Sequence, residues 1–352
     1  MTTLTFLRSI RLLAWVLAAL GAQPALAQPA DNKLDLESTG NFRESLAKVQ
    51  EKGFTKELRQ LPAEHLAMPT HADMLAAAKA GSRVVVVGDH GIVLLSDDGG
   101  KTYRQARDVP TRVMLTSVCF IDDRVGWAAG HWGVVLHTQD GGETWKLLRQ
   151  DVNVDQPLFS VYFLDATNGV AVGLWSLALR TTDGGATWST VKILAPPGAD
   201  RTGPNLYQVF PGKEANTLYI AAELGVVYRS DDGGQNWRMI LTGNRGSLWT
   251  GLTLKDGSLL VAGLNGKILR STDGAKTWTA LESNVTASLT DLAQGPDGSV
   301  IGVGLEGVVV NSKDGVNFVA NPRPDRATLT AVLVTGQGSP VVFAKEGVVG
   351  SN

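Results

Sequence analysis

The stretch GVVYRSDDGGQNW, from Gly225 to Trp237, decides the fold of this chain because close variants of it recur along the sequence. It ends in two acids, two glycines, two polar residues and a tryptophan. The other copies are LLSDDGGKTY (94–103), LHTQDGGETW (136–145), LRTTDGGATW (179–188), LRSTDGAKTW (269–278) and the decayed VNSKDGVNF (310–318). Such regular recurrence indicates a repeat architecture rather than one isolated site.

The aspartate of this repeated motif, here called the box, sets the period. The box aspartates are Asp98, Asp140, Asp183, Asp232, Asp273 and Asp314, with successive spacings of 42, 43, 49, 41 and 41 residues. One unit fits four short strands, as in LTSVCFI (115–121), VGWAAGH (125–131), VVLHTQ (134–139) and ETWKLL (143–148). Radial repetition of four-stranded sheets makes a β-propeller, so we predict an all-β propeller.

A second marker counts the units. Seven residues before each box aspartate stands Gly91, Gly133, Ser176, Gly225, Gly266 or Gly307, and a seventh marker, Gly347, has no box after it. We therefore predict a seven-bladed propeller over residues 54–352, with the last blade ending in its third strand. An N-terminal strand can complete the last blade of such a ring, and Phe54 to Leu61 is our candidate.

The box itself is predicted to hold the fold together rather than to bind metal. Its aspartate can accept backbone N–H groups across its own turn, and glycine tolerates the positive φ that the turn needs. The tryptophan can fill the wedge between diverging blades. An EF-hand-type calcium loop needs alternating oxygen ligands and a later glutamate, which SDDGGQNW does not supply. We expect no metal and no other cofactor.

The first 27 residues have the features of a secretory signal peptide. Arg8 and Arg11 precede an apolar run from Leu12 to Ala22, and Ala25-Leu26-Ala27 is a cleavage site of the small-x-small kind. We expect cleavage after Ala27, a periplasmic protein and no membrane insertion, because no later apolar run reaches about 20 residues. Residues 28–53 are predicted to be a lead with a short helix that ends at Gly53.

Charge and cysteine content narrow the class of function. The net charge is -2, and no basic stripe suggests a nucleic-acid partner. Cys119 is the only cysteine and lies in an apolar predicted strand, where a thiol is usually an inert core residue. The chain is therefore expected to be stabilised by packing alone, without an internal disulfide.

The box is known as the Asp box or bacterial neuraminidase repeat, and it raises sialidases as one resemblance. Sialidases also carry an Arg-Ile-Pro motif and a tyrosine nucleophile, but this sequence has no Arg-Ile-Pro. The five tyrosines, at 103, 162, 207, 219 and 228, all fall in predicted strands or boxes. Asp165 and Asp291 are weak candidates for paired catalytic carboxylates. We expect no enzyme, and a carbohydrate-active propeller, either a lectin or a glycosidase, is the alternative.

A closer resemblance is to the photosystem II stability/assembly factor family and its relatives in non-photosynthetic bacteria. The strand-wide pattern SVCFIDDRVGWAAGHWGVVLHTQDGGETW (117–145) carries it, and SVYFLDATNGVAVGLWSLALRTTDGGATW (160–188) repeats it. The resemblance implies an exported, non-enzymatic scaffold that binds membrane-protein partners during assembly. Such relatives often occur beside resistance-nodulation-division exporters, which implies an exporter subunit as one kind of partner.

Loops on the propeller face opposite the boxes are the candidate partner site, because binding residues tend to lie on loops that a rigid scaffold positions. The turns between second and third strands, here called tips, supply the candidates His90, His131, Trp132, Trp175, Glu223, Glu306 and Lys345. The blade-to-blade links add Arg112, Arg201, Arg245, Arg323 and Arg326, and the longest link is APPGADRTGPNLY (195–207).

Arginine forks onto carboxylates, so these links could bind carboxylate-bearing peptide segments. Ordinary solvated arginines are the alternative. Trp132 and Trp175 lie at equivalent tips of adjacent blades, where they form an exposed aromatic contact or cap the channel. His90 and His131 lack a third ligand at short spacing, and a metal site is not expected there. We expect a monomer that binds a protein.

Overall fold

The computed structural model describes residues 61–350 except positions 201 and 337. The predicted signal peptide and lead lie outside the described residues, and so does the predicted closing strand Phe54–Leu61 apart from Leu61 itself. The repeat region belongs to one compact unit over Lys56–Asn352, and it is this unit that is described below.

The described part of the unit consists of seven antiparallel sheets, each a meander whose strands follow in chain order. Blade 1 contains β1 (Met74–Ala80), β2 (Arg83–Gly88), β3 (Val93–Ser96) and β4 (Arg104–Gln105). Blade 2 contains β5 (Leu115–Phe120), β6 (Gly126–Gly130), β7 (Val135–Thr138) and β8 (Lys146–Arg149). Blade 3 contains β9 (Leu158–Phe163), β10 (Gly169–Gly173), β11 (Ala178–Thr181) and β12 (Ser189–Thr190).

The remaining blades repeat this plan. Blade 4 contains β13 (Leu206–Pro211), β14 (Leu218–Ala222), β15 (Val226–Ser230) and β16 (Arg238–Leu241). Blade 5 contains β17 (Leu248–Thr253), β18 (Leu259–Gly263), β19 (Ile268–Ser271) and β20 (Thr279–Leu281). Blade 6 contains β21 (Leu289–Gln294), β22 (Val300–Gly304), β23 (Val309–Ser312) and β24 (Val319–Ala320). Blade 7 contains β25 (Leu329–Val334), β26 (Pro340–Ala344) and β27 (Gly347–Val349).

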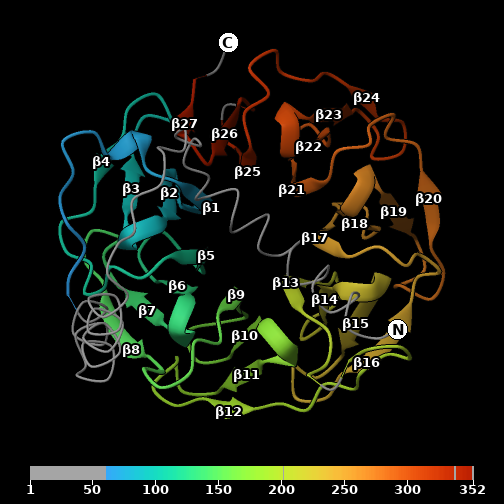
Figure 1. Cartoon of the computed structure of the whole chain (residues 1–352), viewed down its shortest axis with the longest axis horizontal. Coiled ribbons are helices and arrows are strands. Elements are labelled where there is room, and N and C mark those ends of the chain that lie inside the picture. Colours follow the sequence, from blue (N-terminus) through green and yellow to red (C-terminus); the bar gives the residue numbers. More distant parts are fainter. Residues whose placement is uncertain (1–60, 201, 337, 351–352) are drawn as a thin grey trace, which may run out of the picture. The chain divides into compact units, whose positions relative to one another are not determined.

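The seven blades form a closed ring around a common axis (Figure 1). Their first strands contact one another in the order β1, β5, β9, β13, β17, β21, β25 and back to β1. Threonine hydroxyls tie several of these strands together. The Oγ1 of Thr116 donates to the carbonyl of Leu158 at 2.6 Å, and that of Thr330 donates to the carbonyl of Met74 at 2.6 Å. The second of these bonds joins blade 7 to blade 1.

Hydrophobic cores lie between neighbouring blades. The second strands β6, β10, β14, β18 and β22 are buried at every position, because blades cover both of their faces. One core cluster joins Val85 of blade 1 to Leu136 of blade 2 and to the box residue Trp145. Box tryptophans therefore fill the spaces between blades, as the sequence predicts. The seven-bladed all-β architecture is confirmed.

Cys119 lies in β5, as predicted from the apolar run around it. Burial raises the pKa of its thiol to about 12. A thiol with so high a pKa is almost entirely protonated near neutral pH, so it is a poor nucleophile. Cys119 is therefore an inert packing residue.

A candidate partner-binding face

The box hairpins, between third and fourth strands, are closed by their own aspartates. Asp232 accepts hydrogen bonds from the Ser230 hydroxyl at 2.8 Å and from the backbone N–H groups of Gln235 and Asn236 at 3.0 and 2.9 Å. The Trp237 indole N–H donates to the Gly234 carbonyl at 3.0 Å. Each box carboxylate is used within its own turn, which is the structural role that the sequence suggested.

The electrostatics of the boxes agree with this role. The other five box aspartates accept the same Ser or Thr hydroxyl bond from two residues upstream. The hydrogen bond from the Thr187 hydroxyl, together with its backbone N–H, lowers the pKa of Asp183 to about 2, and the equivalent bonds from Thr277 lower that of Asp273 to about 2. A carboxylate that is ionised and fully hydrogen-bonded is stabilised as an acceptor, not poised as a proton donor.

The tips on the opposite face are single 3₁₀ turns with one unusual residue each. They are η2 (Asp89–Gly91), η3 (His131–Gly133), η4 (Leu174–Ser176), η5 (Glu223–Gly225), η6 (Leu264–Gly266) and η7 (Leu305–Gly307). The central residues have φ between 53° and 60°, and they are His90, Trp132, Trp175, Leu224, Asn265 and Glu306. Positive φ is uncommon outside glycine and is strained for bulky residues.

Each tip lies against the link that leaves its own blade. A Cβ atom at Gly225 would lie only 2.0 Å from the carbonyl oxygen of Asn244, which belongs to the link between blades 4 and 5. A Cβ atom at Gly91 would lie 2.0 Å from the carbonyl oxygen of Thr111. Tips and links therefore share one face, as the sequence predicts, and this tip face is the surface that we describe further.

Ser176 takes the glycine position in η4, with a φ of 57°. Its hydroxyl donates to the carbonyl of Pro204 at 3.1 Å, and its N–H donates to the same carbonyl at 2.9 Å. Both bonds anchor the longest link, 195–207, to the tip of blade 3. Blade 3, in which Ser176 replaces the glycine found in the other tips, is thus also the blade that the longest link follows.

Apolar side chains gather at the tips of blades 2, 3 and 4. Trp132 is half-buried and packs on the core between blades 1 and 2, whereas Trp175 is 47% exposed and Leu224 is 37% exposed. Val154, in the link between blades 2 and 3, is 49% exposed. We call Trp132, Val154, Trp175 and Leu224 the apolar arc. The central tip residues of blades 1, 5 and 6 are polar, so among the central residues of η2 to η7 the apolar ones belong to blades 2, 3 and 4.

Most of the predicted link arginines are engaged within the chain. Arg112 pairs with Glu64 at 2.7 Å, Arg323 pairs with Asp325 at 2.6 Å, and Arg326 pairs with Glu306. Arg245 is exposed and forms no ion pair with the described residues. Arg201 lies outside the described residues. Of the four predicted link arginines that the structure describes, only Arg245 has no ion-pair partner among the described residues. The other three pair with acidic side chains whose proximity the sequence spacing did not reveal, so these arginines do not form a ring of free guanidinium groups.

The remaining predicted contact residues occupy varied positions on the tip face. His90 lies 3.0 Å from the Asp89 carboxylate, and Lys345 is half-buried. Glu223 accepts the N–H of Asn205 at 3.0 Å, and burial raises the pKa of its carboxyl. His90 is the central residue of its tip, whereas His131 is the first residue of the next one. Within the described ranges, no three His, Cys, Asp or Glu side chains form a group that could hold a metal ion.

The two carboxylates considered for glycosidase chemistry have structural partners. Asp291 lies in β21, where burial raises the pKa of its carboxyl to about 6. Its oxygens accept the backbone N–H groups of Leu292 at 2.8 Å and Val332 at 2.9 Å. Asp165 accepts the N–H groups of Thr167 and Asn168 within its own turn.

Among the described helices, none is long and apolar enough to cross a membrane.

Seven antiparallel blades in a closed ring, six of them with Asp-box hairpins, define an Asp-box β-propeller. The family model for the photosynthesis system II assembly factor YCF48 matches residues 55–151, 105–262 and 148–311. The chain belongs to this family. None of the curated proteins matches it.

The solved structures with the same fold include the following three. One, YCF48 bound to D1 peptide, has a TM-score of 0.64 and 20% sequence identity, over 82% of this chain and 97% of that chain. YCF48 from Cyanidioschyzon merolae has a TM-score of 0.64 and 18% identity, over 81% of this chain and 96% of the other. The WD40 propeller domain of Doa1 has a TM-score of 0.61 and 15% identity, over 83% and 95%. These likenesses show the shared propeller fold.

Proposed function

We propose that this protein is an exported, non-enzymatic assembly factor that holds a protein partner on its tip face. Membership of the assembly-factor family supports a protein-binding role. A structural relative has been solved with a bound peptide, which makes a polypeptide segment a reasonable ligand for this propeller as well. The proposal places the protein in the periplasm after cleavage behind Ala27, with a membrane protein or an exporter subunit as partner.

One observation carries the choice of face. Trp175 and Leu224 are bulky, exposed and held at positive φ on adjacent tips. Backbone strain of this kind costs roughly 1–3 kcal/mol and tends to persist where function requires it. Tryptophan is also enriched among the residues that contribute most of the binding energy, and these cluster near the centre of protein interfaces. Strain and exposure together favour the apolar arc as the centre of the contact.

The chemistry of the arc predicts the kind of segment that binds. Arg245 lies in the link next to the tip that carries Leu224, since the Asn244 carbonyl touches that tip. An exposed guanidinium beside apolar side chains suits a partner segment in which a carboxylate follows apolar residues. We therefore expect an acidic, partly apolar segment rather than a glycan or a nucleic acid.

A crosslinking pulldown from envelope extracts tests the proposal, with Leu224→Asp and Arg245→Glu as variants. The proteins captured by the wild-type chain are identified by mass spectrometry and quantified for each variant. We expect capture of the specific partner to fall about tenfold or more, because a charge is placed within the contact. Arg238→Glu is the matched control, since Arg238 is 53% exposed at the box end of β16, next to the box residue Trp237. Equal capture by all three variants would refute the tip face as the binding surface.

Location needs its own measurement. Cell fractionation should place the protein in the periplasm, and mass spectrometry of the mature protein should find Gln28 as its first residue. A cytoplasmic protein that begins at the initiator methionine would remove export from the proposal while leaving the tip-face contact to be judged by the pulldown.

A further inference from the structure

Each box hairpin also covers the blade before it. The carbonyl of the first box glycine accepts a hydrogen bond from that preceding blade in several pairs. Trp127 of blade 2 donates to Gly184 of blade 3 at 2.9 Å, and Arg180 of blade 3 donates to Gly233 of blade 4 at 3.1 Å. Arg229 of blade 4 donates to Gly274 of blade 5 at 2.8 Å. The outer surface of a blade is thus shaped to receive a glycine turn.

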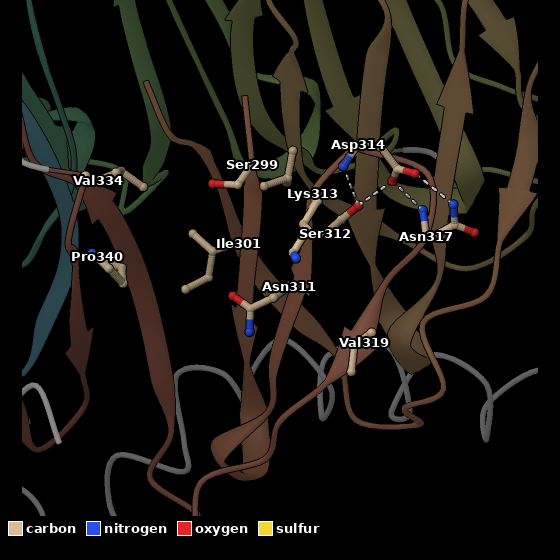
Figure 2. Close-up of a pocket in the computed structure, with 12 residues that line it drawn as sticks. Ser299, Ile301, Asn311, Ser312, Lys313, Asp314, Asn317, Val319, Val334 and Pro340 are labelled. Carbon is tan, nitrogen blue, oxygen red and sulfur yellow. Dashed lines mark hydrogen bonds between the residues drawn. The ribbon is translucent and has the colours of Figure 1, made fainter. Parts of the chain in front are cut away.

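Among the described residues, no box hairpin covers blade 6, because none follows Gly347 in blade 7. An open groove of about 510 Å³ lies in its place, between blades 6 and 7. Figure 2 shows Ile301, Asn311 and Lys313 on the blade 6 side and Val334 and Pro340 on the blade 7 side. The groove lies on the box side of the propeller, since Asp314 and Asn317 of the sixth box also line it.

Burial along the third strands shows that the cover is missing. Val309 of β23 is only half-buried, whereas the equivalent residues of the first five blades are fully buried. Those residues are Val93, Val135, Ala178, Val227 and Ile268. Asn311 is exposed, although the residues equivalent to it in blades 1 to 5 are all buried or half-buried. The face of blade 6 that points toward blade 7 is therefore more exposed than the corresponding faces of blades 1 to 5.

We propose that this groove binds a turn of a partner polypeptide in which an aromatic side chain follows closely after glycine. The sister blades define this chemistry, since each receives a box turn with an aromatic ring close behind it. The ring stands three residues after the second glycine position in five boxes and two residues after it in the sixth. Val319 and Pro340, both exposed, supply apolar contacts for the ring. The Asn311 amide and the Lys313 ammonium supply donors for a peptide carbonyl, in the way that Arg180 and Arg229 do in other blades.

This site is separate from the tip face and stands independently of the proposed function. It also differs from the fourth-strand position beside β27. The sequence expected at that position, Phe54 to Leu61, has no Asp-Gly turn. A strand there would complete the sheet without filling the turn position, so the groove is a binding site in its own right.

A synthetic peptide tests the groove directly. The probe is a fluorescent peptide with the sequence RSDDGGQNWR, which is the box of blade 4 from Arg229 to Arg238. Its binding to the full chain is followed by fluorescence anisotropy, and we expect saturable binding with a Kd below about 1 mM. Val319→Glu and Lys313→Glu should each weaken it about tenfold or more. A peptide with alanine in place of tryptophan should bind more weakly by a similar factor.

Matched controls distinguish peptide binding at the groove from non-specific binding and from unfolding of the variants. Lys276→Glu makes the same charge reversal as Lys313→Glu at an exposed lysine of the fifth box, outside the groove, and it should bind the peptide like the wild type. Val319 is 62% exposed, so its replacement should leave the thermal unfolding temperature unchanged. Absence of saturable binding, or equal binding by the wild type and both groove variants, would overturn the proposal.

A photo-crosslinking amino acid at position 319 identifies the occupant. Crosslinking of the peptide through its glycine-to-tryptophan turn supports the proposal. Crosslinking only to another part of the same molecule would contradict it, because the groove would then be filled by this chain itself. Both results are read by mass spectrometry of the crosslinked fragments from the full chain.

Discussion

Box hairpins and tip hairpins lie at opposite ends of the same strands, and both require positive φ, yet they meet this requirement with different residues. In the boxes the positive-φ positions are glycines, as at Gly99 and Gly100, with Ala275 as the one substitution among the described boxes. At the tips the central position is never glycine in η2 to η7. A glycine at each tip would remove the strain, so its absence indicates that the side chains there have a use beyond folding.

The two kinds of hairpin also differ in what their side chains contact. A box aspartate accepts hydrogen bonds within its own turn, and a box aromatic ring packs between blades. The side chains of the boxes therefore serve the fold and are not free to bind a partner. Tip residues change from histidine to tryptophan, leucine, asparagine and glutamate around the ring. This variation on a constant backbone is typical of a binding surface carried on a rigid scaffold.

The largest effect is expected where a tip meets its link. Gly225→Ala would bring a Cβ atom to 2.0 Å from the Asn244 carbonyl oxygen, at a φ of 69°. Since that oxygen belongs to the backbone, the link has to move, and we expect the free energy of unfolding to fall by at least about 3 kcal/mol. Urea denaturation followed by tryptophan fluorescence measures the loss.

Gly99→Ala is the matched control in a box. Gly99 has a similar φ of 77°, but a Cβ atom there would meet nothing within 4 Å. Only the conformational strain remains, so the expected loss is about 1 kcal/mol. Equal losses for the two variants would show that the tips are not locked by their links.

Much of this architecture was predictable because the repeat exposes it. The box aspartates gave the repeat period, and the glycine markers gave the blade count and the tips, since both recur at fixed offsets whatever the local sequence. The pairing of Arg323 with Asp325 or of Arg112 with Glu64 has no such periodicity. The positive φ of Trp175 was also hidden, because tryptophan is among the residues least expected there. Sequence repetition therefore predicts the propeller scaffold. It does not predict ion pairs or backbone conformations that occur at single positions.

A smaller effect is expected for the two adjacent acids of the fourth box. Asp232→Ala removes four hydrogen bonds from an exposed turn, which resembles the loss of a helix N-cap and should cost about 1 kcal/mol. Asp231→Ala removes the ion pairs of a half-exposed carboxylate with Arg229 and Arg238 and a 3.4 Å hydrogen bond from the Thr217 hydroxyl, and it should cost about 0.5 kcal/mol. Urea denaturation of both variants at pH 7 compares them, and equal losses would refute the turn-tying role.

The pH dependence of that difference gives an independent check. Partial burial raises the pKa of Asp232, but the hydrogen bonds from Asn236 and Ser230 outweigh it, and the pKa is lowered overall. A lowered pKa in the folded state contributes stability above the unfolded pKa of about 3.9, and this contribution is lost as pH falls through the folded value. The gap between wild type and Asp232→Ala should therefore narrow below about pH 4, and a gap that widens in acid would contradict this role.

The smallest expected effect has the opposite sign. Trp175→Gly relieves the strain of a tryptophan at a φ of 53°. Glycine in turn loses more conformational entropy on folding, so we expect a net gain in stability of about 0.5 kcal/mol. Asn265→Gly at the equivalent tip of blade 5 should be nearly neutral, because asparagine tolerates this conformation. If Trp175→Gly proved stabilising while capturing less partner in the envelope pulldown, the tip would be a place where folding free energy is given up for binding. A destabilised Trp175→Gly variant would instead show that Trp175 packs as part of the fold. Trp175 would then have a structural role like that of the box residues, and the contrast between tips and boxes would not hold there.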